Sequence, residues 1–407
     1  MGKPEIRFKG YTDEWEQRKF ADFTWDAGKR NKEDLDLEPY AITNEHGFIR
    51  QCDAHDDFGY MKDTDRKAYN IVQPNSFAYN PARINIGSIG YYKGVENVIV
   101  SSLYEVFQTD NYVNDRFLWH WFKSDEFPRW IERLQEGSVR LYFYYDKLCE
   151  CQLYMPSLEE QEKIASFLDA LDHLITLHQR KCDEVKSLKK YMLQKMFPQN
   201  EQKVPEIRFE GFTEAWEQRK FGEITELKSA SRVHKDEWTS NGVPFYRSSD
   251  VMAAINGTEN EKAFISEKLY EKPSKVSGKL EEGDILVTGG GSVGNPYIVP
   301  DNKSLYTKDA DLLWIKNKGK FHPYFLYEFF FSPTFRNYLG SISHVGTIAH
   351  YTITQLSDTP IGLPNFEEQK EVGEYFQSLD HLITLHHHKP SPIANLPDFT
   401  YNHHKSC

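Results

Sequence analysis

Two amphipathic helices are the clearest elements in the pattern of apolar and polar positions along the chain. From about residue 159 to 196, apolar residues recur in alternating steps of four and three, the heptad pattern of a helix that packs against another helix. This seam consists of Ile164, Leu168, Leu171, Ile175, His178, Cys182 and Val185. Pro198 ends the run, so we expect a helix of about 38 residues, roughly 57 Å long.

A second helix begins with the same pattern and is shorter. Its seam continues the corresponding steps with Val372, Phe376, Leu379 and Ile383. Prolines then follow at positions 390, 392 and 397, and each removes a helix hydrogen-bond donor and clashes with the preceding turn. We therefore expect this helix to stop near residue 388 after about 22 residues. The C-terminal half of the first helix would then lack the second helix that is expected to pack against it.

The segments outside these helices have the mixed pattern of an α+β fold. Residues 71–108 and 278–315 are rich in aromatic and β-branched residues and are interrupted by Gly, Pro and Asn, as sheets with turns are. Each is followed by a helical aromatic stretch, at 117–130 and 323–339. The two bodies therefore share a plan, although their sequences differ.

The chain contains two copies of the same framework. Residues 4–20 and 205–221 are identical at 13 of 17 positions with an offset of 201, and residues 156–178 return at 364–386 with an offset of 208. A period of about 200 residues is too long for a solenoid repeat. Two similar modules that present two reading surfaces fit better, and a target with matching half-sites is the natural ligand of such an arrangement.

Composition limits the class of protein without deciding it. The 407 residues are 39% hydrophobic and 27% charged, which is typical of a soluble globular chain of several domains. With 49 Lys and Arg against 61 Asp and Glu, the net charge is −12, a sign that by itself argues against binding to DNA. The sum does not show, however, whether basic side chains gather on one face.

The same composition gives expectations about location and cysteine chemistry. No run of apolar residues approaches the roughly 18 that a membrane helix needs, and the first residues lack the apolar core of a signal peptide, so we expect a cytoplasmic protein without a membrane partner. The five cysteines are odd in number and form no Cys-x-x-Cys pair, so neither a disulfide framework nor a zinc site is indicated.

Motifs for catalysis or for a cofactor are weak or missing in the sequence. The glycines of 289–294 could hold a phosphate, but no Gly-Lys-Ser/Thr follows them, and a hairpin or a loop laid against a DNA groove is the better interpretation. The histidines at 386–388, 403 and 404 have no acidic or cysteine partner at metal-site spacing. We therefore predict no catalytic residue, no metal and no cofactor.

The repeated ends resemble the specificity subunit of type I restriction-modification systems. The stretch PSLEEQEKI at 156–164 with FLDALD at 167–172, echoed by PNFEEQ at 364–369, is similar to the start of that family's spacer helices. WEQRKF at 15–20 and at 216–221 is similar to the entry into its target recognition domains. GDILV at 283–287 and NPARINIGSIG at 80–90 resemble stretches within those domains. The resemblance covers about residues 4–388.

The resemblance implies a non-catalytic protein whose two target recognition domains each read one part of a bipartite site on double-stranded DNA. The spacer helices of that family pack antiparallel in a pseudo-twofold arrangement, and methyltransferase subunits and a restriction subunit join them. The implied division is 1–155 and 201–363 for the recognition domains, 156–200 and 364–388 for the spacer helices, and 389–407 for a divergent tail. We attribute the truncated second helix to a frameshift or a recombination within the repeat.

Groove chemistry selects the candidate DNA contacts within the recognition domains. Arg, Lys, Asn, Ser, Thr and Tyr on loops are the side chains that reach base edges and phosphates. In the first domain these are Asn80, Arg83, Asn85, Ser88, Tyr92, Lys93, Ser138 and Arg140. In the second they are Tyr246, Arg247, Ser248, Ser249, Thr288, Ser292, Thr347 and His350. The helix contacts are expected at Ile164, Leu168, Leu171, Ile175, Val372, Phe376, Leu379 and Ile383.

Two other functions fit the sequence. The first is an orphan truncated fragment of the same ancestry that no longer assembles, which co-purification with a methyltransferase subunit would separate from a working subunit. The second is a two-headed scaffold that binds proteins through acidic faces and the 14% aromatic content. A steep loss of duplex binding with added salt argues against the scaffold, because it reports counterion release from phosphate contacts.

Overall fold

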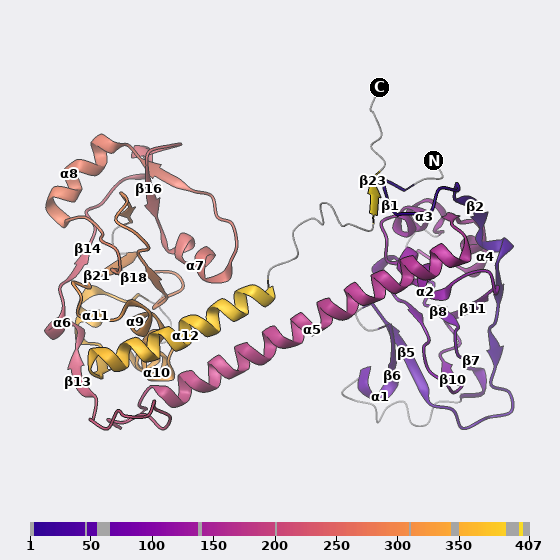
Figure 1. Cartoon of the computed structure of the whole chain (residues 1–407), viewed down its shortest axis with the longest axis horizontal. Helices are drawn as coiled ribbons and strands as arrows, with labels where there is room; N and C mark the ends of the chain where they lie inside the picture. Colours follow the sequence, from indigo (N-terminus) through magenta and orange to yellow (C-terminus); the bar gives the residue numbers. More distant parts are fainter. Residues whose placement is uncertain are drawn as a thin grey trace. The chain divides into compact units, whose positions relative to one another are not determined.

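In the computed structural model the chain forms two compact units, which are described separately (Figure 1). Unit 1 comprises Met1–Thr176 with Pro390–Cys407, and unit 2 comprises Leu177–Lys389. The structure describes residues 4–44, 47–54, 66–136, 141–199, 202–308, 311–342, 350–387 and 399–401.

Unit 1 is built on a four-stranded antiparallel sheet and a five-stranded mixed sheet. The first has the order β3–β11–β8–β9, with strands Thr24–Asp26, Glu105–Thr109, Phe77–Tyr79 and Ile89–Tyr91. The second has the order β4–β7–β10–β5–β6, with strands Lys29–Arg30, Asn70–Val72, Val98–Val100, Pro39–Thr43 and Gly47–Arg50. Two short pairs complete it: β12–β2 (Gln152–Met155, Glu16–Lys19) and β1–β23 (Ile6–Phe8, Phe399–Tyr401).

Short helices accompany the sheets of unit 1. They are α1 Gln51–Ala54, α2 Asp115–Phe122, α3 Glu126–Leu134, α4 Tyr145–Glu150 and the 3-10 turns Phe20–Asp22, Arg66–Ala68 and Ile84–Ile86. The core between helices and sheet is strongly aromatic, and Phe20, Phe77 and Phe107 in it are fully buried. Aromatic rings bury a large apolar area per residue, so this cluster supplies much of the unit's stability.

Unit 2 repeats this plan with different residues. Its antiparallel sheet has the order β14–β21–β18–β19, with strands Leu227–Ser229, Leu312–Ile315, Ile285–Thr288 and Pro296–Ile298. A mixed sheet has the order β15–β17–β16–β20, with strands Trp238–Thr239, Ala263–Ile265, Val243–Tyr246 and Tyr306–Thr307, and β13–β22 pairs Glu217–Lys220 with Pro360–Leu363. The helices are α6 Phe221–Ile224, α7 Ser248–Asn256, α8 Glu267–Ser277, α9 Pro323–Phe329, α10 Pro333–Ile342, α11 Ile353–Asp358 and the 3-10 turn Lys235–Glu237.

The predicted α+β class with two similarly built halves is confirmed. The predicted aromatic helices, however, are each divided into two, α2 and α3 in unit 1 and α9 and α10 in unit 2. A serine marks both breaks: the hydroxyl of Ser124 donates to Trp121 O and accepts from Glu126 N, and Ser332 does the same with Phe329 O and Phe335 N. A serine hydroxyl that bonds to the backbone on both sides of the break competes with continuation of the first helix.

The repeated sequence at the start of each half is fixed by a buried ion pair. Arg7 forms two hydrogen bonds with Glu160, of 2.7 and 2.8 Å, and Arg208 forms two with Glu368, of 2.6 and 2.7 Å. Both glutamates are buried in the first turn of a long helix. A bidentate pair of this kind needs Arg and a carboxylate at defined positions, which accounts for the repetition of these residues in the two halves.

The two long helices are α5, Leu158–Met196, and α12, Phe366–His387. The second ends where the prolines predict, and Figure 1 shows it alongside the later half of α5. The expectation that the C-terminal half of the first helix lacks a partner was therefore wrong, because antiparallel packing places α12 against that half. The contacts run antiparallel: His178 Nδ1 lies 3.0 Å from His386 Nδ1, Lys189 Nζ lies 2.6 Å from Asp380 Oδ1, and the ring of Phe197, just after α5, lies 6.1 Å from that of Phe376. The pseudo-twofold relation between the halves stays a prediction.

The seam residues of the two helices differ in burial. Val372, Phe376 and Leu379 are buried in the core of unit 2, and Ile383 packs against it. On α5, Ile164 packs against the core of unit 1, Leu168 and Leu171 are half-buried, and Ile175 is 55% exposed. Among the described residues, no helix is long and apolar enough to cross a membrane.

Candidate nucleic-acid interface

Each unit presents the same pair of loops, tied together by the same backbone hydrogen bond. In unit 1 the β8–β9 loop meets the segment before α4, and Phe143 N donates to Pro81 O at 3.0 Å. In unit 2 the β18–β19 loop meets the segment before α11, and Tyr351 N donates to Gly289 O at 2.8 Å. Gly289 and Tyr351 each lie 208 positions after their counterparts, the offset of the second repeat. We call these two structures the paired loops.

The paired loops of unit 1 border a cleft of about 780 Å³. Three predicted contact residues line it: Asn80, Arg83 and Asn85. The side chain of Asn80 accepts a hydrogen bond from Ala82 N at 3.0 Å, so it shapes the loop as well. Arg83 and Asn85 are exposed. An exposed guanidinium beside amide groups has the donors and acceptors that read base edges.

Two aromatic residues that the sequence analysis missed also line this cleft. Tyr142 and Tyr144 stack at 5.5 Å between ring centroids with an angle of 2° between the ring planes. Phe143 between them is buried in the core. The alternation in LYFYY at 141–145 was the available signal, because a single buried aromatic in an extended segment places its two neighbours on the opposite face.

An acidic side chain modifies the electrostatics of the cleft. Glu105 lies in its lining, and burial raises the pKa of this carboxyl above its usual value. A half-buried carboxyl is a hydrogen-bond partner for a base and a poor neighbour for a phosphate, because its charge repels the anion. The cleft is therefore better suited to base edges and aromatic faces than to the DNA backbone.

The other candidates in the first recognition domain have different placements. Ser88 is buried and donates to Ile42 O at 2.9 Å, and buried Tyr92 donates to Glu96 O at 2.9 Å. Their hydroxyls are used inside the fold, so these two residues support the surface and do not offer atoms to a ligand. Lys93 is exposed. Ser138 and Arg140 lie outside the described residues.

The paired loops of unit 2 are glycine-rich, and the hairpin is locked from inside. Thr288 is buried, and its hydroxyl donates to Ser292 O and accepts from Asn295 N. Gly294 has φ +75°, and a Cβ there would lie 2.9 Å from the ring of Phe335, so only glycine fits. Ser292 at the tip is exposed, and His350 is exposed beside the loop. Thr347 lies outside the described residues.

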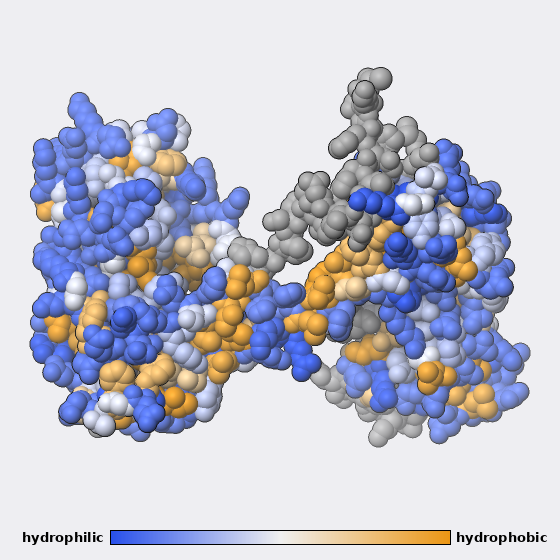
Figure 2. All heavy atoms as spheres, viewed as in Figure 1, coloured by the Kyte–Doolittle hydropathy of each residue, from blue (hydrophilic) through white to orange (hydrophobic). Residues whose placement is uncertain are grey.

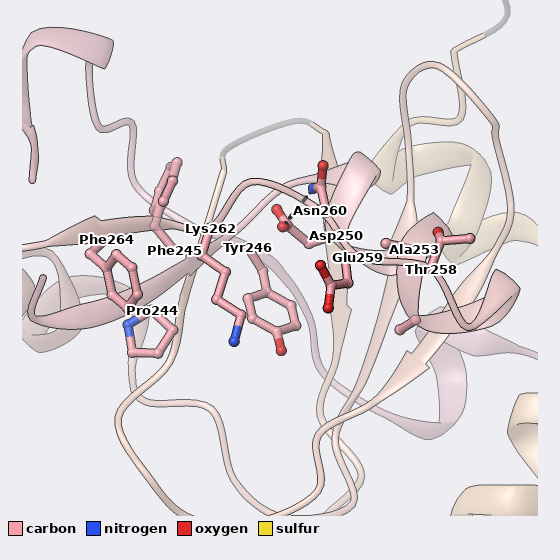
Figure 3. A pocket seen from close by; sticks show the side chains of 12 residues that line it. Pro244, Phe245, Tyr246, Asp250, Ala253, Thr258, Glu259, Asn260, Lys262 and Phe264 are labelled. Carbon is pink, nitrogen blue, oxygen red and sulfur yellow. Dashed lines mark hydrogen bonds between the residues drawn. The ribbon is translucent and has the colours of Figure 1, made fainter. Parts of the chain in front are cut away.

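A second cleft, of about 620 Å³, lies in unit 2 at the end of β16 (Figure 3). Its lining includes the predicted contact Tyr246 together with Glu259, Lys262 and Asp250. Figure 3 shows the hydrogen bond of 2.8 Å between Asn260 Nδ2 and Asp250 Oδ1 at its wall. With two carboxylates in its lining, this cleft is suited to the exocyclic amino groups of bases and not to phosphate.

The neighbours of Tyr246 mainly hold this cleft in shape. Arg247 pairs with Asp250 at 2.9 Å, and its guanidinium lies 5.5 Å from the ring centroid of Trp238. Ser248 donates to Asp311 O at 3.0 Å, and the hydroxyl of Ser249 accepts from Asn260 at 3.0 Å. Four consecutive residues, 246–249, were predicted as contacts here, and of these Tyr246 lines the cleft. Asn260, Glu259 and Lys262 were missed because their loop carries no motif.

The family profile described as "Type I restriction modification DNA specificity domain" matches residues 13–187 and again 213–395. These matches cover most of the chain and follow its two halves. The chain belongs to this family. The type I specificity family thus accounts for the repeated ends, the two bodies and the two long helices.

Individual relatives agree with the family assignment. The chain is 24% identical over 392 residues to the "Type I restriction enzyme MjaVIII specificity subunit" of Methanocaldococcus jannaschii, covering 92% of this chain and 88% of the relative. It is 24% identical over 279 residues to the "Putative type I restriction enzyme specificity subunit S.HindORF215P" of Haemophilus influenzae, covering 67% and 66%. The crystal structure of the type I S subunit from M. genitalium superimposes with a TM-score of 0.56 at 14% identity, covering 93% and 94%, which shows a common fold.

Proposed function

We propose that this member of the type I specificity family is the sequence-specific DNA-recognition subunit of a restriction-modification complex, and that each half reads one part of a bipartite target. The observation that carries this proposal is the recurrence of the paired loops, with the same hydrogen bond and different exposed side chains, in both units. Keeping a scaffold while changing the side chains on its loops is how one fold reads two different sequences.

In the first recognition domain the proposed reading surface is the cleft beside the β8–β9 loop. Arg83 is proposed to contact guanine through two hydrogen bonds, and Asn80 and Asn85 to contact adenine. Lys93 is exposed and is assigned to phosphate. Ser138 and Arg140 follow α3 in the sequence and stay in the proposal on residue type alone.

In the second recognition domain the proposal keeps the exposed side chains and gives the others a supporting role. Ser292 and His350 belong to the paired loops, and Thr347 precedes them in the sequence. Tyr246, with Glu259, forms an acidic cleft for the amino groups of cytosine or adenine. The supporting residues are Arg247, Ser248, Ser249 and Thr288.

The chemistry of the complex is assigned to its partners. We propose a non-catalytic, cytoplasmic subunit without a cofactor of its own, to which methyltransferase subunits and a restriction subunit bind. The proposed division into recognition domains, spacer helices and tail is the one stated above, 1–155, 156–200, 201–363, 364–388 and 389–407.

The pair of long helices offers a docking surface for the methyltransferase subunits. The seam residues of α12 are occupied within the chain, whereas Leu177, Leu382 and Leu385 are exposed, and Figure 2 shows apolar residues at the surface along the helices. Leu385 lies 208 positions after Leu177, so equivalent residues of the two repeats contribute. Methyltransferase subunits are proposed to cover these leucines.

Mapping of methylated adenines tests the function directly. The chain is expressed with its methyltransferase subunits in cells that otherwise lack adenine methylation, and the genome is sequenced for modified adenine. A split motif with two specified parts is expected. Methylation without a split motif contradicts the proposal of two reading halves.

An orphan fragment is the second candidate, and the length of α12 favours it. The helix ends at His387, which corresponds to Gln179 in the first repeat, whereas α5 continues 17 residues further, to Met196. A shortened helix pair gives methyltransferase subunits less to bind. If tagged chain retains no methyltransferase subunit on purification and no adenine is modified in cells, the orphan is the correct assignment.

A further inference from the structure

The stacked tyrosines of unit 1 form an aromatic wall at the edge of the first cleft. The rings of Tyr142 and Tyr144 are parallel within 2°, and Tyr144 is 47% exposed. Large aromatic faces that remain in contact with water are costly in a soluble protein, and a flat exposed ring is the typical surface on which an unpaired nucleobase stacks.

Backbone hydrogen bonds hold this wall in place before any ligand binds. Tyr142 exchanges two with Glu136, of 2.8 and 2.9 Å, and Lys147 N donates to Tyr144 O at 3.0 Å. Between the two tyrosines, Phe143 is anchored in the core and bonded to Pro81 O. Because the segment is fixed on both sides, stacking on it costs little conformational entropy.

The rest of the cleft supplies what the edge of a base requires. Arg83 and Asn85 offer donors and an acceptor, and Glu105 offers a carboxyl whose pKa burial raises. Leu103, which is 73% exposed, and Leu141 add an apolar rim. An aromatic face combined with polar groups that can reach a base edge is the composition of sites that bind unstacked bases.

We propose that this cleft binds a nucleobase taken out of the duplex stack, with the base lying on Tyr144 and its edge toward Arg83 and Asn85. The inference rests on the proposed function, because the chain must first hold a duplex. Binding energy gained on the tyrosine compensates for the lost base stacking, so the first half-site is recognised partly through the ease with which it unstacks.

The equivalent positions of unit 2 carry no tyrosine, which provides an internal control. The positions 208 residues after the two tyrosines are His350 and Thr352. The hydroxyl of Thr352 accepts from Gln355 N at 3.3 Å and caps α11, so it serves the fold. This stacking site is therefore proposed for the first recognition domain alone.

Fluorescence of 2-aminopurine placed in the target tests the inference. The full chain in complex with its methyltransferase subunits is added to duplexes that carry the probe at successive positions of either half, and affinity is measured separately by anisotropy. A severalfold rise in fluorescence is expected at one position of the half assigned to unit 1 other than the adenine that the methyltransferase subunits modify, since methyltransferases also take their target base out of the stack. Tyr144→Ala removes the rise and weakens binding by roughly 10-fold, within the usual range for loss of one stacked base, whereas Tyr144→Phe keeps both.

Controls separate this inference from the proposed function. Tyr154→Ala, at an exposed tyrosine on β12 of the same unit, leaves fluorescence and affinity unchanged. Tight sequence-specific binding without such a rise in the first half, outside the modified adenine, or with one that persists in Tyr144→Ala, overturns the inference and leaves DNA recognition intact. Failure to bind any duplex specifically overturns both.

Discussion

Lys189 of α5 lies between two carboxyl groups where α5, α9 and α12 meet. Its ammonium is 2.8 Å from Glu328 and 2.6 Å from Asp380. Glu328 is fully buried, one of its oxygens has no hydrogen-bond partner among the described residues, and burial raises its pKa to about 8. Burial lowers the pKa of Lys189, but the two carboxyl groups outweigh it and the pKa lies above its usual value. At neutral pH the Glu328 carboxyl is therefore mostly protonated beside the Lys189 ammonium.

The pH dependence of stability follows from the protonated Glu328. Its folded pKa is raised above the unfolded value, so its contribution is fully present below about pH 4.5 and is lost as pH rises through about 8. Glu328→Gln keeps the shape without the proton. We expect the variant to match the native chain at pH 5 and to exceed it in free energy of unfolding by roughly 2 to 4 kcal/mol at pH 9.

Urea denaturation of the whole chain between pH 5 and 9 measures this difference in the free energy of unfolding. Glu371→Gln, at an exposed residue of α12, is the matched control and leaves the pH profile of the native chain. If Glu328→Gln follows the native profile at every pH, the carboxyl is ionised in the fold and the assignment is incorrect.

The role of Arg83 is decided by how its removal affects different sequences. A guanidinium that reads guanine discriminates against other bases, so Arg83→Ala should cost about 1 to 3 kcal/mol on the native target and relax one position of it. Binding by the complex to a set of single-base target variants measures both effects. A uniform loss on every sequence, with a smaller salt slope, would instead assign Arg83 to phosphate.

At the scale of elements, one sequence occurs in two environments. Residues 171–178 and 379–386 both read LDHLITLH. In α12, Leu379 is buried and Ile383 packs on the core of unit 2, to which α5 contributes Val185 and Leu193. In α5 the equivalent Leu171 is half-buried and Ile175 is exposed. The difference in burial arises from what each helix packs against, because the local sequence is the same.

This repetition predicts that one substitution has two outcomes. Ile383→Glu places a charge in the seam between α12 and α5 and should destabilise unit 2 by about 2 to 4 kcal/mol. Ile175→Glu changes an exposed position and should stay within about 0.5 kcal/mol of the native chain. Thermal or urea unfolding of the two variants measures both values. Equal losses would show that Ile175 is covered in solution.

The helices could be predicted from sequence because heptad seams and prolines are local signals. The division of the aromatic stretches could not, since it depends on whether the hydroxyls of Ser124 and Ser332 bond to the neighbouring backbone or point to solvent. The sheets were recognised as a class only, because strand order depends on contacts far apart in the chain.

The candidate site was predicted in part for the same reason. Residue type alone selected Arg83 and Asn85, which are exposed in the cleft, and also Ser88, Tyr92 and Thr288, which are buried. A hydroxyl on a loop can face either way, and only the folded hairpin shows that these three bond to its own backbone.

At the scale of the whole molecule, the net charge of −12 opposes binding to an anionic polymer. The two clefts of the proposed reading surfaces contain carboxyl groups, so phosphate contacts must come largely from partner subunits. We therefore expect the isolated chain to bind target duplex weakly and the complete complex to bind at least 100-fold more tightly, with a steeper dependence of log K on log salt. Anisotropy titrations of both at several salt concentrations measure this. Equal affinities and slopes would place the phosphate contacts on the chain itself, on the exposed lysines of its recognition domains.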